Sequence, residues 1–261
     1  MSENLVLYES HPPAVVLRIN RADKRNALNR GLIAALTEAF DKAGNDARAR
    51  CVILTGEGTV FCAGMDLAEL EQSVQTANRA DQVWDDALRL ARLYDLIYTL
   101  PKPTIAAVNG PAVAGGAGLA TVCDLAVATP DARFGYPEVR RGLVAAMVMP
   151  HLFRHVGERM GRYLLLTGEL ITAEEACRSG LINAVEPRQT LLDRAKTWAV
   201  ALAEGGPDAL AATKRLLHRF SHQALSIEEA AQASAAPRLS AECQEGLRAF
   251  FEKRPAPWAA F

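Results

Sequence analysis

The sequence lacks a strong net charge, a long apolar run and an N-terminal basic segment followed by an apolar one. Each of these absences argues against one class of protein. Its 261 residues include 29 lysines and arginines and 30 aspartates and glutamates, so the formal net charge is −1. This balance gives no field to attract nucleic acid or a membrane surface. No stretch approaches the ~20 apolar residues of a membrane span, and the first residues do not resemble a signal peptide. We therefore expect a cytoplasmic protein with neither nucleic acid nor membrane as a partner.

Metal-binding and disulfide patterns are lacking as well. The five cysteines are an odd number, widely spaced and without a C-x-x-C pair, so buried thiols in a reducing compartment are expected. His151 and His155 are four residues apart but lack the glutamate of an H-E-x-x-H zinc motif. A P-loop and a G-x-S-x-G nucleophile elbow are also missing. We predict no metal site and no disulfide framework.

What the sequence does contain is an alternation of apolar runs and amphipathic segments. Half of its residues are apolar, and a chain of this length can bury a sizeable α/β core. After Pro187 the pattern is helical and more apolar than an exposed tail should be, so we expect a subunit interface there. We divide the chain into a core over 1–200 and a helical oligomerisation region over 201–261. The runs that predict strands are 5–8, 15–20, 51–55, 104–108, 125–129 and 181–185.

Two of these predicted strands, 51–55 and 104–108, lead into glycine-rich loops and then into probable helix starts. Glycine lets the backbone approach a ligand closely, and a helix start offers free N–H groups. For the loop with Gly115, Gly116 and Gly118, three interpretations stand. A dinucleotide fingerprint would need a third glycine where Thr121 stands. The others are close helix–strand packing and an oxyanion site that draws a second N–H from the loop after 51–55.

Several short motifs follow one another along the chain. They are Asn26-Ala27-Leu28, Phe61-Cys62-Ala63-Gly64-Met65-Asp66-Leu67, Ile105-Ala106-Ala107-Val108-Asn109-Gly110 with Ala114-Gly115-Gly116, Cys123-Asp124, Phe134-Gly135-Tyr136-Pro137-Glu138 and Phe250-Phe251-Glu252-Lys253-Arg254. In these motifs the sequence resembles the enoyl-CoA hydratase/isomerase (crotonase) superfamily. The similarity is collinear and covers nearly the whole chain, and it is the order and spacing of the motifs together that make it specific. The resemblance implies an α/β fold built as a crotonase-like spiral of strand-strand-helix units with a C-terminal helical trimerisation region, and hence a homotrimer or a hexamer.

The resemblance also implies a ligand and the residues that bind it. Members of the superfamily bind an acyl-CoA thioester and stabilise its enolate oxygen with two main-chain N–H groups, which correspond here to Met65 and Gly115. Coenzyme A is then part of the substrate, and no separate cofactor is expected. For exposed lysines and arginines, an ordinary solvated surface stays an open interpretation. The positions implied for substrate and CoA binding are Lys24, Arg25, Ala27, Ala63, Asp66, Leu67, Gly116 and Lys253.

Glu138 is the side chain that the resemblance implies for proton transfer. Taken alone, a glutamate at that place fits a helix first turn, where the helix dipole favours it. It matches one of the two glutamates that hydratases of this superfamily use, whereas the other falls at Gly118, which has no side chain. A shift of a 3-enoyl to a 2-enoyl thioester needs only one carboxylate, so the sequence favours Δ3,Δ2-enoyl-CoA isomerisation. A hydratase with an atypical second group, another enolate chemistry and a non-catalytic acyl-CoA-binding scaffold stay open.

Overall fold

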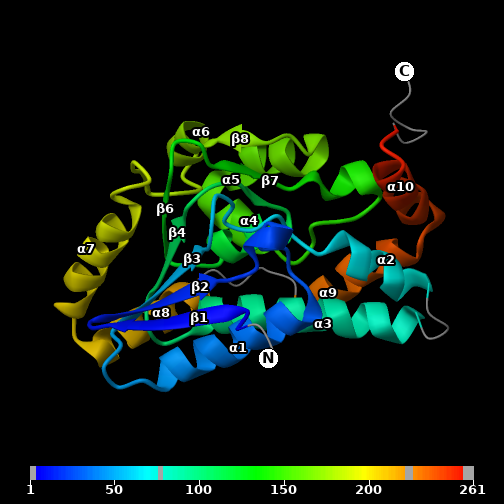
Figure 1. Ribbon diagram of the computed structural model, residues 1–261. Coiled ribbons are helices and arrows are strands. Elements are labelled where there is room, and N and C mark those ends of the chain that lie inside the picture. Colours follow the sequence, from blue (N-terminus) through cyan, green and yellow to red (C-terminus); the bar gives the residue numbers. More distant parts are fainter. Residues whose placement is uncertain (1–3, 76–78, 221–225, 255–261) are drawn as a thin grey trace.

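A computed structural model describes residues 4–75, 79–220 and 226–254, and its framework is two β-sheets with helices packed around them (Figure 1). The larger sheet has the strand order β1-β2-β3-β4-β6-β9, and the smaller has the order β5-β7-β8. β1 pairs antiparallel with β2, and the rest of the larger sheet is parallel. The strands are β1 Val6–His11, β2 Ala14–Ile19, β3 Cys51–Gly56, β4 Thr104–Val108, β5 Ala112–Val113, β6 Leu125–Ala128, β7 Arg133–Gly135, β8 Ile171–Thr172 and β9 Ala184–Val185.

Both faces of the larger sheet are covered, which explains why its strands read as continuous apolar runs. Val15 and Leu17 point into the main core beside helices α1 and α3, whereas Val16 points into a second core with α7. In Figure 1 the helix α7 runs along one side of this sheet. The helices are α1 Arg30–Asn45, α2 Leu67–Gln75, α3 Arg79–Thr99, α4 Gly115–Thr121, α5 Met149–Thr167, α6 Ala173–Arg178, α7 Leu191–Ala203, α8 Pro207–Phe220, α9 Ile227–Ala235 and α10 Ala241–Phe251, with the short 3₁₀ turns η1 Ala22–Lys24, η2 Pro137–Arg141 and η3 Ala236–Leu239.

Most elements lie where their residue patterns predict them, and one does not. The strand predicted over 181–185 shrinks to β9, because Leu181 and Ile182 are buried in the main core from the turn that follows α6. The division at residue 200 falls inside α7, so a boundary between two regions stays a prediction. Within the described ranges, none of the helices is both long and apolar enough to cross a membrane.

The C-terminal helices fold back over the molecule instead of trailing from it. α9 packs along α3, where Ala231 and Ala235 join a buried cluster with Val83 and Ala87. The turn η3 then packs against α3, and helix α10 contacts η2 and α2. In Figure 1 the orange and red segments of α9 and α10 accordingly lie beside α3 and α2. This return of the chain brings residues beyond 230 to the site described next.

Candidate active site

A cavity of about 130 Å³ opens where the two glycine loops, η2, α3 and the α9–η3 turn meet. Its walls are mainly apolar, and its few polar groups come from widely separated parts of the chain. Such a pocket, with convergent polar groups in apolar surroundings, is the expected form of a small-molecule site. The residues that line it are Ala63, Met65, Leu67, Leu70, Leu90, Tyr94, Val113, Ala114, Gly115, Pro137, Glu138, Arg141, Leu143, Val144, Ala145, Met147, Val148, Ser234 and Arg238.

The main-chain amides of Met65 and Gly115 both belong to this cavity wall. Leu28 bridges the residues on either side of Met65, since its N–H donates to Gly64 O (2.7 Å) and its carbonyl accepts from Asp66 N (2.8 Å). Gly115 begins α4, so its N–H has no acceptor within that helix. Among the described residues, neither amide has a hydrogen-bond acceptor. Two main-chain donors are therefore left available at one cavity.

The two loops that carry these amides touch each other. A Cβ added at Gly64, whose φ is +90°, would lie 3.5 Å from the nitrogen of Gly115 and 2.9 Å from the Cβ of Ala114. Ala114 itself has φ 53° and ψ −127°, a conformation that costs a residue with a Cβ of order 1–3 kcal/mol. Its own N–H is held by the carbonyl of Gly135 at 2.8 Å. The surrounding structure thus holds a strained residue next to the Gly115 amide.

Gly116 serves packing and does not line the cavity. A Cβ there would overlap the carbonyl oxygen of Cys62 and come within 2.8 Å of the Cys62 Cβ. The same carbonyl accepts from Val113 N at 3.0 Å, so it cannot move away freely. The interpretation of this loop as close packing is therefore correct for Gly116, while Gly115, one residue earlier, faces the cavity.

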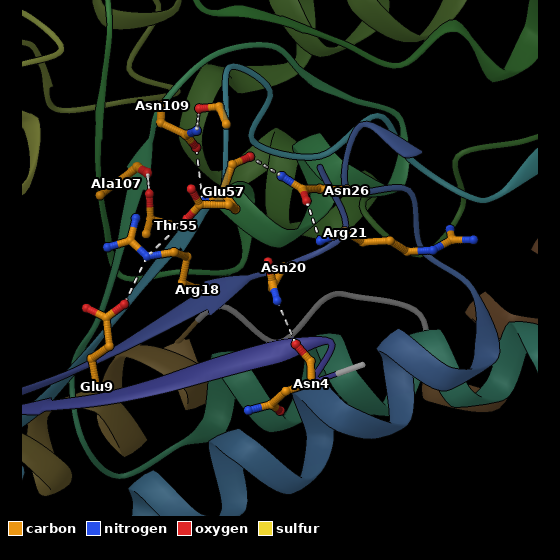
Figure 2. Close-up of polar contacts among 12 residues, drawn as sticks. Asn4, Glu9, Arg18, Asn20, Arg21, Asn26, Thr55, Glu57, Ala107 and Asn109 are labelled. Atoms are coloured by element: carbon orange, nitrogen blue, oxygen red, sulfur yellow. Dashed lines mark hydrogen bonds and ion pairs between the residues drawn. The ribbon is translucent and has the colours of Figure 1, made fainter. Parts of the chain in front are cut away.

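Two asparagines tie together the loops that follow β2, β3 and β4 (Figure 2). Buried Asn26 accepts from Arg21 N at 3.0 Å and donates from Nδ2 to the carbonyls of Glu57 (2.9 Å) and Val60 (2.7 Å). Asn109 accepts from Gly56 N at 3.0 Å and donates to Gly58 O at 2.9 Å. Buried amides whose oxygen and nitrogen are both hydrogen-bonded hold a loop in one conformation. Both asparagines belong to the motifs quoted above, but their partners could not be read from spacing.

Glu138 stands on η2 with its carboxyl group at the cavity. Pro137 precedes it at the start of that turn, and Oε2 is buried with no hydrogen-bond partner. Burial raises the pKa of Glu138 to about 7, although its own main-chain N–H and the charges of Arg141 and Arg238 oppose this rise. A carboxyl group with such a pKa is present in both protonation states near neutral pH, which suits a group that accepts and returns a proton.

Tyr94, a residue that sequence reasoning missed, fills the space next to Gly118. A Cβ added at Gly118 would overlap the Tyr94 hydroxyl oxygen. That hydroxyl donates to the carbonyl of Gly115 at 2.6 Å, and burial raises the pKa of Tyr94 well above its usual value, so the group stays neutral. A weak signal was available, because Tyr94 follows Leu90 by one helical turn on the buried face of α3.

The residues predicted to bind CoA are only partly gathered at the cavity. Ala63 and Leu67 line it. Asp66 does not, because its carboxylate pairs with Arg21 at 2.7 Å and caps the start of α2. Lys24, Arg25 and Lys253 are exposed, while Ala27 is half-buried and its carbonyl accepts from Arg21 at 2.9 Å.

Comparisons with known proteins find similarity along nearly the whole chain. The profile of the family described as enoyl-CoA hydratase/isomerase matches residues 12–260. A protein of Thermus thermophilus that is named as an enoyl-CoA hydratase is 45% identical over 253 residues, which are 96% of this chain and 99% of its own. The 2,3-dehydroadipyl-CoA hydratase of Escherichia coli is 35% identical over 97% of each chain. The crystal structure of an enoyl-CoA hydratase/isomerase from Xanthobacter autotrophicus superposes with a TM-score of 0.86 at 29% identity, covering 97% of each chain, so the predicted crotonase fold is confirmed.

Proposed function

The chain belongs to the enoyl-CoA hydratase/isomerase family of acyl-CoA-processing enzymes, and on that premise we propose that it isomerises 3-enoyl-CoA to 2-enoyl-CoA. The observation that carries this proposal is at Gly118. That position has no side chain, and the space beside it is filled by Tyr94. Glu138 is then the single carboxylate that lines the cavity among the described residues. One carboxylate is sufficient for a double-bond shift.

The proposed reaction moves one proton from C2 of the acyl chain to C4. Glu138, as a carboxylate, removes a proton from C2, and the electron pair of that C–H bond passes into a dienolate. The dienolate oxygen accepts hydrogen bonds from the amides of Met65 and Gly115, each contributing about 3 kcal/mol to the lowering of the barrier. The protonated Glu138 then delivers the proton to C4, so the double bond lies between C2 and C3 and no atom is gained or lost.

Hydration of a 2-enoyl-CoA is the second candidate, because relatives of this chain carry hydratase names. Hydration benefits from one group that handles the water and another that handles the α-proton. Tyr94 is the nearest polar group to the empty position at Gly118, but its hydroxyl is neutral and already donates to the carbonyl of Gly115. It is therefore a poor base, and the isomerase is favoured.

Binding of the CoA part and assembly of subunits are further parts of the proposal. We assign the phosphates to Lys24 and Arg25, which are exposed at the end of η1, and to Lys253 after α10. Exposed apolar side chains on α8 and α10, such as Leu216 and Phe251, support a homotrimer or a hexamer built through these helices.

The test is an assay of the purified protein with 3-enoyl-CoA and 2-enoyl-CoA, alongside Glu138→Gln. The amide keeps the shape of the side chain and removes the base, so isomerisation should fall by roughly 10²- to 10⁴-fold. Glu38→Gln, on the exposed side of α1, is the matched control and should retain full activity.

Three outcomes would contradict the proposal. Isomerisation that survives in Glu138→Gln would remove that residue from the mechanism. Rapid hydration of 2-enoyl-CoA by the wild type would establish the second candidate. Acyl-CoA binding without turnover of either thioester would indicate a scaffold.

A further inference from the structure

Arg238 is a buried cation on the wall of the same cavity. It lies on the turn η3, is only 4% exposed, and lines the cavity together with Ser234. Its Nη2 donates to the Ser234 hydroxyl oxygen at 3.3 Å, whereas its Nη1 is buried and has no hydrogen-bond partner. An unpartnered guanidinium nitrogen is costly in a protein interior, so an acceptor that completes this group is expected.

The carboxylates near Arg238 do not supply the acceptor that its guanidinium lacks. Asp86 exerts the largest effect of any negative charge on Arg238, but both of its oxygens are held by Arg30, at 2.6 and 2.7 Å. Glu138 is the other acidic group nearby, and the proposed mechanism requires it to give up and regain a proton. Within the described residues, Arg238 forms no ion pair.

The remaining charge at the cavity is also positive. Arg141 lines it as well, and its Nε is buried without a partner, while its guanidinium stacks on the ring of Phe250. Two cations and one acidic side chain, Glu138, therefore line a pocket whose other walls are mainly apolar. Apolar walls suit the methylene groups of an acyl chain, and the cations suit an anion at its far end.

We propose that Arg238, assisted by Ser234, binds a carboxylate at the far end of the acyl chain, so that the substrate is the mono-CoA thioester of a dicarboxylic acid. The inference rests on the proposed function, because it assumes that the acyl chain lies in the cavity of Glu138. A guanidinium presents its N–H groups in a planar fork that matches a carboxylate, and Nη1 is free to supply one of these bonds. The hydroxyl of Ser234 can donate another.

The test uses saturated thioesters, which bind but cannot isomerise, and measures their affinity by calorimetry. A dicarboxylic mono-CoA thioester should bind the wild type at least roughly tenfold tighter than an unsubstituted acyl-CoA of the same length. Its ω-methyl ester should lose that advantage, since it keeps the acyl chain, adds one methyl group and removes the charge. Arg238→Met should abolish the difference and leave the affinity for the unsubstituted acyl-CoA within about twofold, while Arg92→Met, exposed on α3, should change neither.

The possible failures are distinguishable from one another. If the wild type binds both thioesters equally well, this inference is wrong and the proposed function is untouched. If it binds neither, the proposed function itself fails. If Arg238→Met weakens both ligands by the same factor, Arg238 supports the fold or Glu138 instead of the substrate. Should the variant not fold, the comparison of the three ligands on the wild type still decides.

Discussion

The cavity has two walls that are built in opposite ways. The main-chain wall consists of Ala63, Met65, Val113, Ala114 and Gly115, and it offers backbone amides. The side-chain wall consists of Glu138, Arg141, Ser234 and Arg238, and it offers charged and polar groups.

The packing behind the two walls differs as well. Around the main-chain wall there is no spare room, since a Cβ at Gly110 would overlap the Thr59 carbonyl and one at Gly116 the Cys62 carbonyl. On the side-chain wall, buried polar atoms of Glu138, Arg141 and Arg238 have no partner in the described chain. A tightly packed backbone positions its N–H donors whatever side chains it carries. Buried polar side-chain atoms without hydrogen-bond partners, in contrast, are suited to bind the polar groups of a ligand. We infer that the first wall supplies the oxyanion donors, whereas the second supplies the base and the groups that select the substrate.

The largest effect is expected from adding one methyl group behind the main-chain wall. In Gly116→Ala the new Cβ would collide with the Cys62 carbonyl, which is backbone and cannot rotate away. We expect a loss of about 3 kcal/mol or more in the free energy of unfolding, measured by urea denaturation. Gly31→Ala on α1 is the matched control, because its Cβ would meet the flexible end of Leu5 at 3.3 Å and the Asn29 side-chain oxygen at an ordinary contact distance of 3.6 Å. This variant should be neutral or slightly stabilising. Equal stability of the two variants would show that the loop tolerates displacement.

Ionisation of Glu138, on the side-chain wall, should determine how the activity depends on pH. Glu138 acts as a base only when it is ionised, and its pKa is about 7. The rate kcat/KM for a 3-enoyl-CoA should therefore fall about tenfold for each pH unit below that value and level off above it. A profile that is flat from about pH 5 to pH 8 would exclude Glu138 as the base.

The same raised pKa has a consequence for stability. The folded state holds the proton of Glu138 to higher pH than the unfolded state does, so this group's contribution is present below the unfolded pKa, near 4.5, and is lost as pH rises through about 7. Glu138→Gln should accordingly raise the melting temperature more at about pH 8 than at about pH 5. This gain would mark the carboxylate as a group kept for function at the expense of stability.

The main-chain wall could be predicted from the sequence far better than the side-chain wall. Its strands are local apolar runs, and its glycine loops follow those strands directly, so neighbouring residues indicate a site there, and the family resemblance implies Met65 and Gly115 as its donors. Both prove to line one cavity. Glu138 was found in the same way, although its raised pKa depends on burial that no motif encodes.

Contacts between distant segments account for what sequence reasoning did not find. Tyr94 lies 24 positions before Gly118, and only the packing of α3 against α4 brings its hydroxyl to the empty place. Arg238 falls in a helical stretch that was interpreted as an oligomerisation region, and nothing in its spacing indicates that η3 turns back to the cavity. The resemblance implies Asp66 for CoA binding, and nothing in its spacing indicates that its carboxylate pairs with the distant Arg21. Helical periodicity identifies a buried face without identifying what that face meets.

The mildest test asks whether one side chain supports the main-chain wall. The Tyr94 hydroxyl donates to the carbonyl of Gly115, whose N–H is one of the two proposed oxyanion donors. Tyr94→Phe removes this bond and leaves the ring, so we expect kcat to fall about five- to tenfold, equivalent to about 1 kcal/mol, with KM nearly unchanged. Tyr98→Phe, one turn further along α3, is the control and should be neutral. Because Tyr94 only positions the amide, the pH profile should keep its midpoint near 7; a displaced midpoint would mean instead that the tyrosine exchanges protons with the substrate or with Glu138.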